Sequence, residues 1–213
     1  MAAVFRIFLF IVMLATPVIA LAQPPSMPRL TGPQKRTLLL IAREAVDASA
    51  EGRSSREATV EARLSVPQSL VVSIYVDGRL RGRAWSLKGG LPLYLGVKAL
   101  AYEAIKGSRD GQPPLTVDEL VKAKVAVAVL SNYVKAADDR EVPPGSAVVI
   151  YNGFTEGLAL PDDIESGKAA ADLLSRACQD AGLRPNVWLL PQTTIYSAAV
   201  EQTSELTVSK GNM

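Results

Sequence analysis

The 213-residue chain contains no histidine and a single cysteine. The missing histidine excludes a Ser-His-Asp triad, a Cys-His pair, a histidine general base and a His-ligated zinc site within this chain. A single cysteine cannot form an internal disulfide, so packing must stabilise the fold. The chain also lacks a large excess of either charge, because 23 Lys and Arg residues are balanced by 21 Asp and Glu residues. Such a chain has no long-range field that would gather nucleic acid or anionic lipid.

The first 22 residues have the pattern of a secretory signal peptide. They carry one positive charge at Arg6, then an apolar run, and end with small residues at Ala20 and Ala22. We therefore expect cleavage after Ala22 and an exported protein, periplasmic or secreted. Pro17 interrupts a run already shorter than the roughly 20 apolar residues of a membrane helix. No stable membrane span is expected after cleavage, and the remainder carries 22 basic and 21 acidic residues.

The rest of the chain divides into three parts by composition. Residues 23–30 are rich in proline and predict an extended leader. Residues 31–203 are long and apolar enough for one domain with a substantial core. Residues 204–213 are polar, which predicts a disordered tail.

The first helix of the domain is marked by a capping box. Thr31 precedes Gln34 by three residues, Pro33 stands in the first turn, and apolar residues then recur at helical spacing. This pattern predicts a helix that runs to about Ala50.

A β-hairpin is predicted next, because β-branched residues 69–76 and the strand that follows flank Asp77-Gly78, a strong two-residue turn signal. The later segments alternate between helical and extended patterns, and they give an α+β fold with antiparallel hairpins and three main helices. The further expected elements are a helix at 92–107, a helical turn at 116–120, a central strand at 123–131, a hairpin around Asn152-Gly153, a helix at 166–182 and a strand at 192–202.

Four separate stretches resemble the AMMECR domain family, and they occur in the family's order. DGRLRGRAWS resembles its hairpin DGxLRGCIG, and PPLTVDELVKAKVAVAVLS resembles its PPLTxEEL segment and the strand ending in VSVLS. GFTEGLALP is similar to GxRGLLLP, and LLSRACQDAGLRPNVW to LxxTCxKAGLxxxxW. The resemblance covers residues 31–203 and implies an α+β domain of two subdomains that share a cleft beside the LRGCIG hairpin, often suspected to be the functional site.

The hairpin departs from the family pattern where chemistry would matter most. Leu80, Arg81 and Gly82 match, but Arg83 stands where the family has cysteine, and Trp85 stands where it has glycine. Arginine can be neither a nucleophile nor a metal ligand, so any function of that cysteine is absent from this chain.

The hairpin also supplies the candidate ligand site. In a regular strand Arg79, Arg81, Arg83 and Trp85 share one face, with Ile74 opposite Arg81, Val72 opposite Arg83 and Ser73 opposite Gly82. Guanidinium groups on an apolar floor beside an indole suit a carboxylate or phosphate. The predicted ligand-binding residues are Arg81, Gly82, Arg83 and Trp85.

A plainer interpretation of the arginines stays open. They can lie over apolar surface in solvent and discourage pairing at a sheet edge. In either case we expect exposed guanidinium groups, so that exchange of Arg81 and Arg83 for glutamine barely changes stability.

For the other candidate functional residues, the sequence context predicts structural roles. Cys178 lies within an apolar helical stripe and is expected to be a buried, slowly reacting thiol. The acidic groups Asp162-Asp163-Glu165 and Asp138-Asp139 lack a calcium-loop spacing, so no metal and no cofactor is expected. The aromatic residues Tyr94, Tyr102 and Trp188 are expected in the core or at its rim.

Two classes of function remain. The first is an exported, non-catalytic binding or interaction module for a small anionic ligand or an acidic segment of a protein partner, with no nucleic acid. The alternative is an enzyme without histidine or cysteine catalysis, in which Arg81 and Arg83 hold a substrate anion. An acid or base with a strongly shifted pKa beside the hairpin, such as Glu119 or Asp110, would favour the enzyme.

Overall fold

The computed structural model of the protein describes residues 29–107, 113–163 and 169–208. The expected signal peptide at 1–22 and most of the leader lie outside the described residues. Within the described ranges no helix combines the length and the apolar character that a membrane crossing requires. The elements in chain order are α1 (Gly32–Ala50), η1 (Ala62–Ser65), β1 (Ser69–Val76), β2 (Arg79–Ser86), α2 (Leu93–Ile105), α3 (Val117–Lys122), β3 (Lys124–Ala136), η2 (Asp139–Glu141), β4 (Ala147–Tyr151), β5 (Glu156–Ala159), η3 (Pro161–Asp163), α4 (Ala170–Asp180), η4 (Val187–Leu189), β6 (Thr194–Ser204) and α5 (Glu205–Val208).

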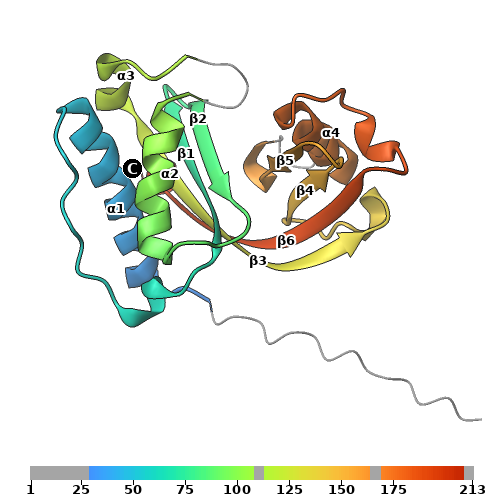
Figure 1. The fold of residues 1–213 in the computed structure, drawn as a ribbon, viewed down its shortest axis with the longest axis horizontal. Coiled ribbons are helices and arrows are strands. Elements are labelled where there is room, and N and C mark those ends of the chain that lie inside the picture. Colours follow the sequence, from blue (N-terminus) through green and yellow to red (C-terminus); the bar gives the residue numbers. More distant parts are fainter. Residues whose placement is uncertain (1–28, 108–112, 164–168, 209–213) are drawn as a thin grey trace, which may run out of the picture.

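The six strands form one antiparallel sheet in the order β2-β1-β3-β6-β4-β5. The long strands β3 and β6 pair in the middle and run through the whole molecule (Figure 1). One lobe holds β1 and β2 with α1, α2 and α3, and the other holds β4 and β5 with α4. The predicted α+β class and the central place of the strand after residue 123 are therefore confirmed.

Two apolar layers fix the helices to the sheet. In the first lobe Leu38 and Val97, from α1 and α2, pack in one cluster with Val72 of β1 and Val127 of β3. In the second lobe Leu174 of α4 packs in another cluster with strands β4, β5 and β6. Every second side chain of a strand contributes to these clusters, since successive residues point to opposite faces of a sheet.

The third apolar cluster lies on the opposite face and shows that the sheet is curled. Trp85 comes from β2 at one edge of the sheet and Leu158 from β5 at the other edge, yet both belong to this cluster. Val71 of β1 and Val149 of β4 lie between them. The sheet is therefore bent into a U, as Figure 1 shows. The side chains of this third cluster lie on its concave side.

The described ends of the chain are attached to this core. The Thr31 side chain accepts a hydrogen bond from the Gln34 backbone N–H, and the Gln34 side chain accepts one from the Thr31 N–H, so the predicted capping box is present. Leu30, in the expected leader, is buried, and its N–H donates to Glu201.

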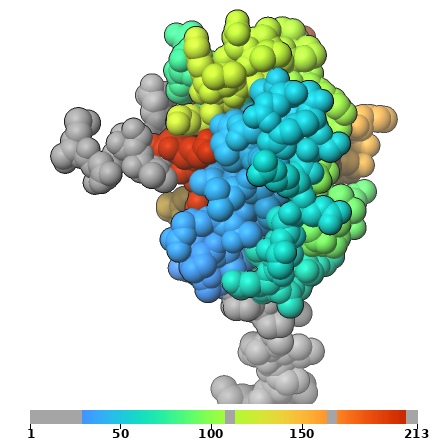
Figure 2. Space-filling model, turned by 90° about the vertical axis from the view of Figure 1, so that its left-hand side faces the viewer, coloured from blue at the N-terminus to red at the C-terminus, as the bar shows by residue number. Residues whose placement is uncertain are grey.

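The expected disordered tail begins differently. Glu205 opens the short helix α5, accepts a hydrogen bond of 2.8 Å from the Val125 N–H and lies 3.5 Å from Arg43 of α1. In Figure 2 the last described segment, drawn in red, lies beside the blue surface of α1. Residues 204–208 are thus folded, because the Glu205 carboxylate is hydrogen-bonded to the backbone of the central strand β3. Residues 209–213 lie outside the described part.

Candidate functional site

The hairpin that carries the candidate residues turns at Asp77 and Gly78, both with positive φ (51° and 76°), as the two-residue turn requires. A β-bulge follows the turn. Ile74 pairs with Gly82 whereas the next residue, Tyr75, pairs with Leu80. Arg81 is consequently the extra residue of the bulge, and the alternation of side chains is interrupted there.

Arg83 lies inside the molecule as part of an ion pair. Its two terminal nitrogens donate to both carboxylate oxygens of Asp163 at 2.6 Å, and its Nε donates to the Ser73 hydroxyl at 2.9 Å. The Arg83 and Asp163 side chains are 3% and 6% exposed. Burial acts to lower the pKa of Arg83, but the hydrogen-bonded Asp163 carboxylate outweighs it, and the pKa is raised.

Arg81 points to another part of the fold. Its Nε and one terminal nitrogen donate to the two carboxylate oxygens of Glu119 on α3, at 2.6 and 3.1 Å. These hydrogen bonds, with a further one from the Thr116 N–H, lower the pKa of Glu119 to about 2. They also raise the pKa of Arg81, which remains charged.

Gly82 and Trp85 are both enclosed. A Cβ on Gly82 would lie 2.1 Å from the Ala104 carbonyl oxygen of α2, so only glycine allows this helix to approach the strand. Trp85 is 6% exposed and packs on the concave side of the sheet.

The predicted arrangement of the arginines on one face is therefore wrong, and so is the predicted register. Arg83 lies opposite Ser73, not Val72, and Gly82 lies opposite Ile74. The bulge separates Arg81, which pairs with α3, from Arg83, which pairs with η3. The expectation of exposed guanidinium groups is also wrong for Arg83; whether these residues bind a ligand stays a prediction.

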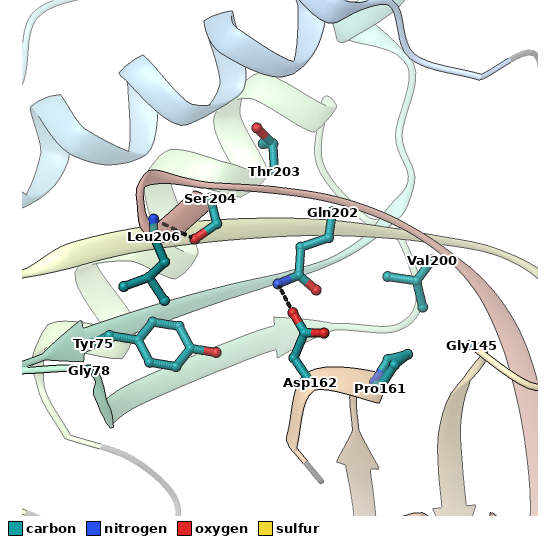
Figure 3. A pocket seen from close by; sticks show the side chains of 10 residues that line it. All are labelled: Tyr75, Gly78, Gly145, Pro161, Asp162, Val200, Gln202, Thr203, Ser204 and Leu206. Atoms are coloured by element: carbon teal, nitrogen blue, oxygen red, sulfur yellow. Dashed lines mark hydrogen bonds between the residues drawn. The ribbon is translucent and has the colours of Figure 1, made fainter. Parts of the chain in front are cut away.

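A cleft of about 460 Å³ lies beside the turn of the same hairpin, between the two lobes. Its lining comes from the β1–β2 hairpin, the loop before β4, η3, and the end of β6 with α5 (Figure 3). The lining residues are Tyr75, Gly78, Gly145, Pro161, Asp162, Val200, Gln202, Thr203, Ser204 and Leu206.

Polar groups from distant segments meet in this cleft. The Gln202 side-chain N–H donates to a carboxylate oxygen of Asp162 at 2.9 Å, and the Tyr75 hydroxyl points toward this pair of residues (Figure 3). Burial raises the pKa of Tyr75; Arg83 opposes that rise, and Asp163 and Asp162 add to it. The phenol thus stays neutral, able to donate and accept hydrogen bonds.

The remaining candidates have structural positions. Cys178 is fully buried on α4 in the cluster against which Trp188 packs, and burial raises the pKa of its thiol. Tyr94 and Tyr102 pack against the core of the first lobe. Asp138 caps η2 and pairs with Arg140.

Asp163 closes the ion pair with Arg83 and also accepts the Leu160 N–H at 2.7 Å. In the part of the chain that the structure describes, which leaves out Glu165, no group of three His, Cys, Asp or Glu residues could hold a metal ion.

The arrangement is suited to binding more than to acid–base chemistry. Glu119 does lie beside the hairpin with a strongly shifted pKa, but a carboxyl with a pKa of about 2 is a poor proton acceptor at neutral pH. Asp110, the other candidate, lies outside the described residues. Tyr75, Gln202 and Ser204 are not among the residues predicted from the sequence, because each lies near the end of a strand and no local pattern marks them as neighbours.

Comparison with known proteins agrees with this fold. A family model described as AMMECR1 matches residues 39–202. A protein of Thermococcus gammatolerans is 31% identical over 120 residues, 52% of this chain and 58% of its own length, so the match spans little more than half of that relative. A protein of Methanopyrus kandleri is 28% identical over 179 residues, 79% of this chain and 86% of the relative.

Among solved structures, the crystal structure of an uncharacterised protein from Pyrococcus horikoshii is similar, with a TM-score of 0.70 and 22% identity, over 80% of this chain and 91% of that one. The architecture agrees with this structure, and the family model spans most of the sequence. The chain belongs to the AMMECR1 family.

Proposed function

We propose that this AMMECR1-family protein is a non-catalytic binding module and that its ligand enters the cleft between the lobes. The observation that carries the proposal is the meeting of Tyr75, Asp162 and Gln202, from three separate segments, around a hollow of about 460 Å³. Convergent polar groups in a concave surface with apolar walls are the usual form of a small-molecule site.

The surroundings support a preformed site. Asp162 belongs to η3, and the next residue, Asp163, is held by the buried guanidinium of Arg83. Gln202 and Ser204 belong to β6, which pairs with the central strand β3. Groups fixed by such neighbours lose little freedom when a ligand arrives, which favours affinity.

An anion at the arginines is the second candidate, because Arg81 is partly exposed and carries its charge at the edge strand β2. An acidic partner segment or a small carboxylate would then replace Glu119 in the ion pair. Arg83 would have to give up Asp163 inside the protein, where separated charges are unfavourable. This candidate therefore depends on Arg81.

A binding screen with the purified protein separates the candidates. Small amines, alcohols, carboxylates and phosphate are added at millimolar concentration, and the thermal unfolding midpoint is recorded, because a ligand that binds only the folded state raises it. Gln202→Trp fills the cleft and should abolish the shift, whereas Gln179→Trp, an exposed exchange on α4, should keep it.

Three results are informative. A shift lost in Gln202→Trp alone supports the cleft. A shift that survives there and disappears in Arg81→Gln supports the anion site. Turnover of a bound compound would contradict a non-catalytic role.

We propose that the protein acts outside the cytoplasm, on the strength of the charge, apolar run and small residues of positions 1–22. The intact mass of protein from the periplasm or medium should correspond to a chain that begins at Gln23. Recovery of the uncleaved chain in the membrane fraction would contradict export with cleavage.

A further inference from the structure

The cleft has a charge of one sign. Among the ten described residues that line it, Asp162 is the only one with a charged side chain. Its carboxylate accepts one hydrogen bond from the neutral amide of Gln202, which orients the group without neutralising it.

The nearby buried charges cancel. Arg83 and Asp163 have opposite charges and share two short hydrogen bonds, so together they add no net charge beside the cleft. Lys124 lies opposite Tyr75 in the β1–β3 ladder and on the same face, but it is exposed and outside the lining. The lining therefore carries the negative charge of Asp162.

Two acceptors face the same side of the cleft. Because the Gln202 amide nitrogen donates to Asp162, its carbonyl oxygen is directed elsewhere, and Figure 3 shows it on the side of Val200, away from Tyr75. The Asp162 oxygen that the amide does not occupy provides the second acceptor on that side, whereas the Tyr75 hydroxyl lies on the other side of the Gln202–Asp162 pair and interacts with Arg83 (Figure 3). An ammonium group has three donors and no acceptor, so it can donate to both oxygens.

The apolar side chains that line the cleft can contact the hydrocarbon part of an amine ligand. Pro161, Val200 and Leu206 give apolar contacts.

We propose that the cleft binds an organic amine in its ammonium form, with the nitrogen at Asp162 and Gln202 and the aliphatic part against Pro161 and Val200. The assignment rests on the proposed binding function and names the ligand class for that cleft. It differs from the anionic ligand expected from the sequence because the lining charge is a carboxylate.

Three probes with the same carbon chain test the charge. n-Butylammonium, n-butanol and butyrate are titrated into isotope-labelled protein, and the backbone amide shifts of the lining residues are followed by NMR. We expect n-butylammonium to bind about tenfold more tightly than n-butanol, the effect of one hydrogen-bonded charge, and butyrate to cause no shifts there.

Two variants make the test specific. Asp162→Asn keeps an acceptor for Gln202 but removes the charge, and it should lower the affinity for n-butylammonium to that for n-butanol. Glu57→Gln removes an exposed carboxylate from the loop after α1 and should leave the affinity unchanged.

The outcomes separate the ligand class from the cleft itself. Equal binding of n-butylammonium and n-butanol, or unchanged binding to Asp162→Asn, would overturn the amine assignment while the cleft remains a binding site. Absence of shifts at the lining residues with all three probes would overturn both proposals.

Discussion

The guanidinium of Arg83 and the carboxylate of Asp163 lie 80 positions apart in sequence and face each other across two hydrogen bonds of 2.6 Å. Arg83 belongs to β2, one edge of the curled sheet, and Asp163 to η3, which follows the other edge strand β5. The pair thus joins the two edges of the U beside the cleft.

Removal of one partner from this pair should be costly. Asp163→Asn or Arg83→Gln leaves a buried charge without its counterion, and we expect a loss of about 3–5 kcal/mol in the free energy of unfolding. Denaturant unfolding measures it. Arg81→Gln, in the more exposed pair with Glu119, is the control and should lose much less. Equal, small losses in all three variants would contradict a structural role of the Arg83–Asp163 pair.

Gly82 should tolerate no side chain. In Gly82→Ala the new methyl group would meet the Ala104 carbonyl oxygen, so β2 and α2 must separate, and we expect a loss of at least about 2 kcal/mol. Gly90→Ala is the matched control, because no atom lies within 4 Å of its added Cβ. Thermal unfolding of both variants checks this; equal midpoints would show that α2 does not press on the strand.

The Arg81–Glu119 pair should make the stability of the folded protein depend on pH in the acidic range. The pKa of Glu119 falls from an ordinary 4.5 to about 2 on folding, so its contribution is present above pH 4.5 and is lost as the pH falls toward 2. The unfolding midpoint of Glu119→Gln should therefore lie below that of the wild type at pH 6 and approach it near pH 2. A difference that stays constant over this range would contradict the lowered pKa.

Cys178 should react slowly with a thiol reagent in the folded protein, because its side chain is fully buried and its thiol pKa is raised by that burial. Cys178→Ser places a hydroxyl in the apolar layer under α4 and should lower the free energy of unfolding by about 1–3 kcal/mol. Labelling followed by mass spectrometry, with and without denaturant, measures the access. Rapid labelling of the native protein would show that the thiol is exposed by motion of α4.

Local signals were sufficient for most elements of the fold, although β3 runs to Ala136, beyond the predicted strand at 123–131, and α5 lies in the expected tail. The capping box at Thr31 and the Asp77-Gly78 turn act through neighbours within a few residues, so their structures could be predicted from the sequence. The helix that carries Cys178 was also expected, although its described part begins at Ala170.

The site could not be predicted in the same way, because it depends on one extra residue and on distant partners. The bulge at Arg81 reverses the alternation on which the common face of the arginines was based. Gly82 gave a usable signal, since glycine within a strand often marks a bulge or a close backbone approach. No local pattern connects Arg83 with Asp163, which the sequence grouped instead with Asp162 and Glu165.

The long side chain at position 83 also has a consequence for inheritance within the family. The LRGCIG pattern that this hairpin resembles has cysteine there, and a thiol on one carbon cannot extend to a carboxylate as a five-donor guanidinium does. An Arg83→Cys exchange alone would leave Asp163 as an uncompensated charge in the interior, whereas exchange of both residues would remove the charge together with its counterion. We therefore expect the residues at positions 83 and 163 to change together in evolution. A protein in which only one of them has changed would carry an uncompensated buried charge and be less stable.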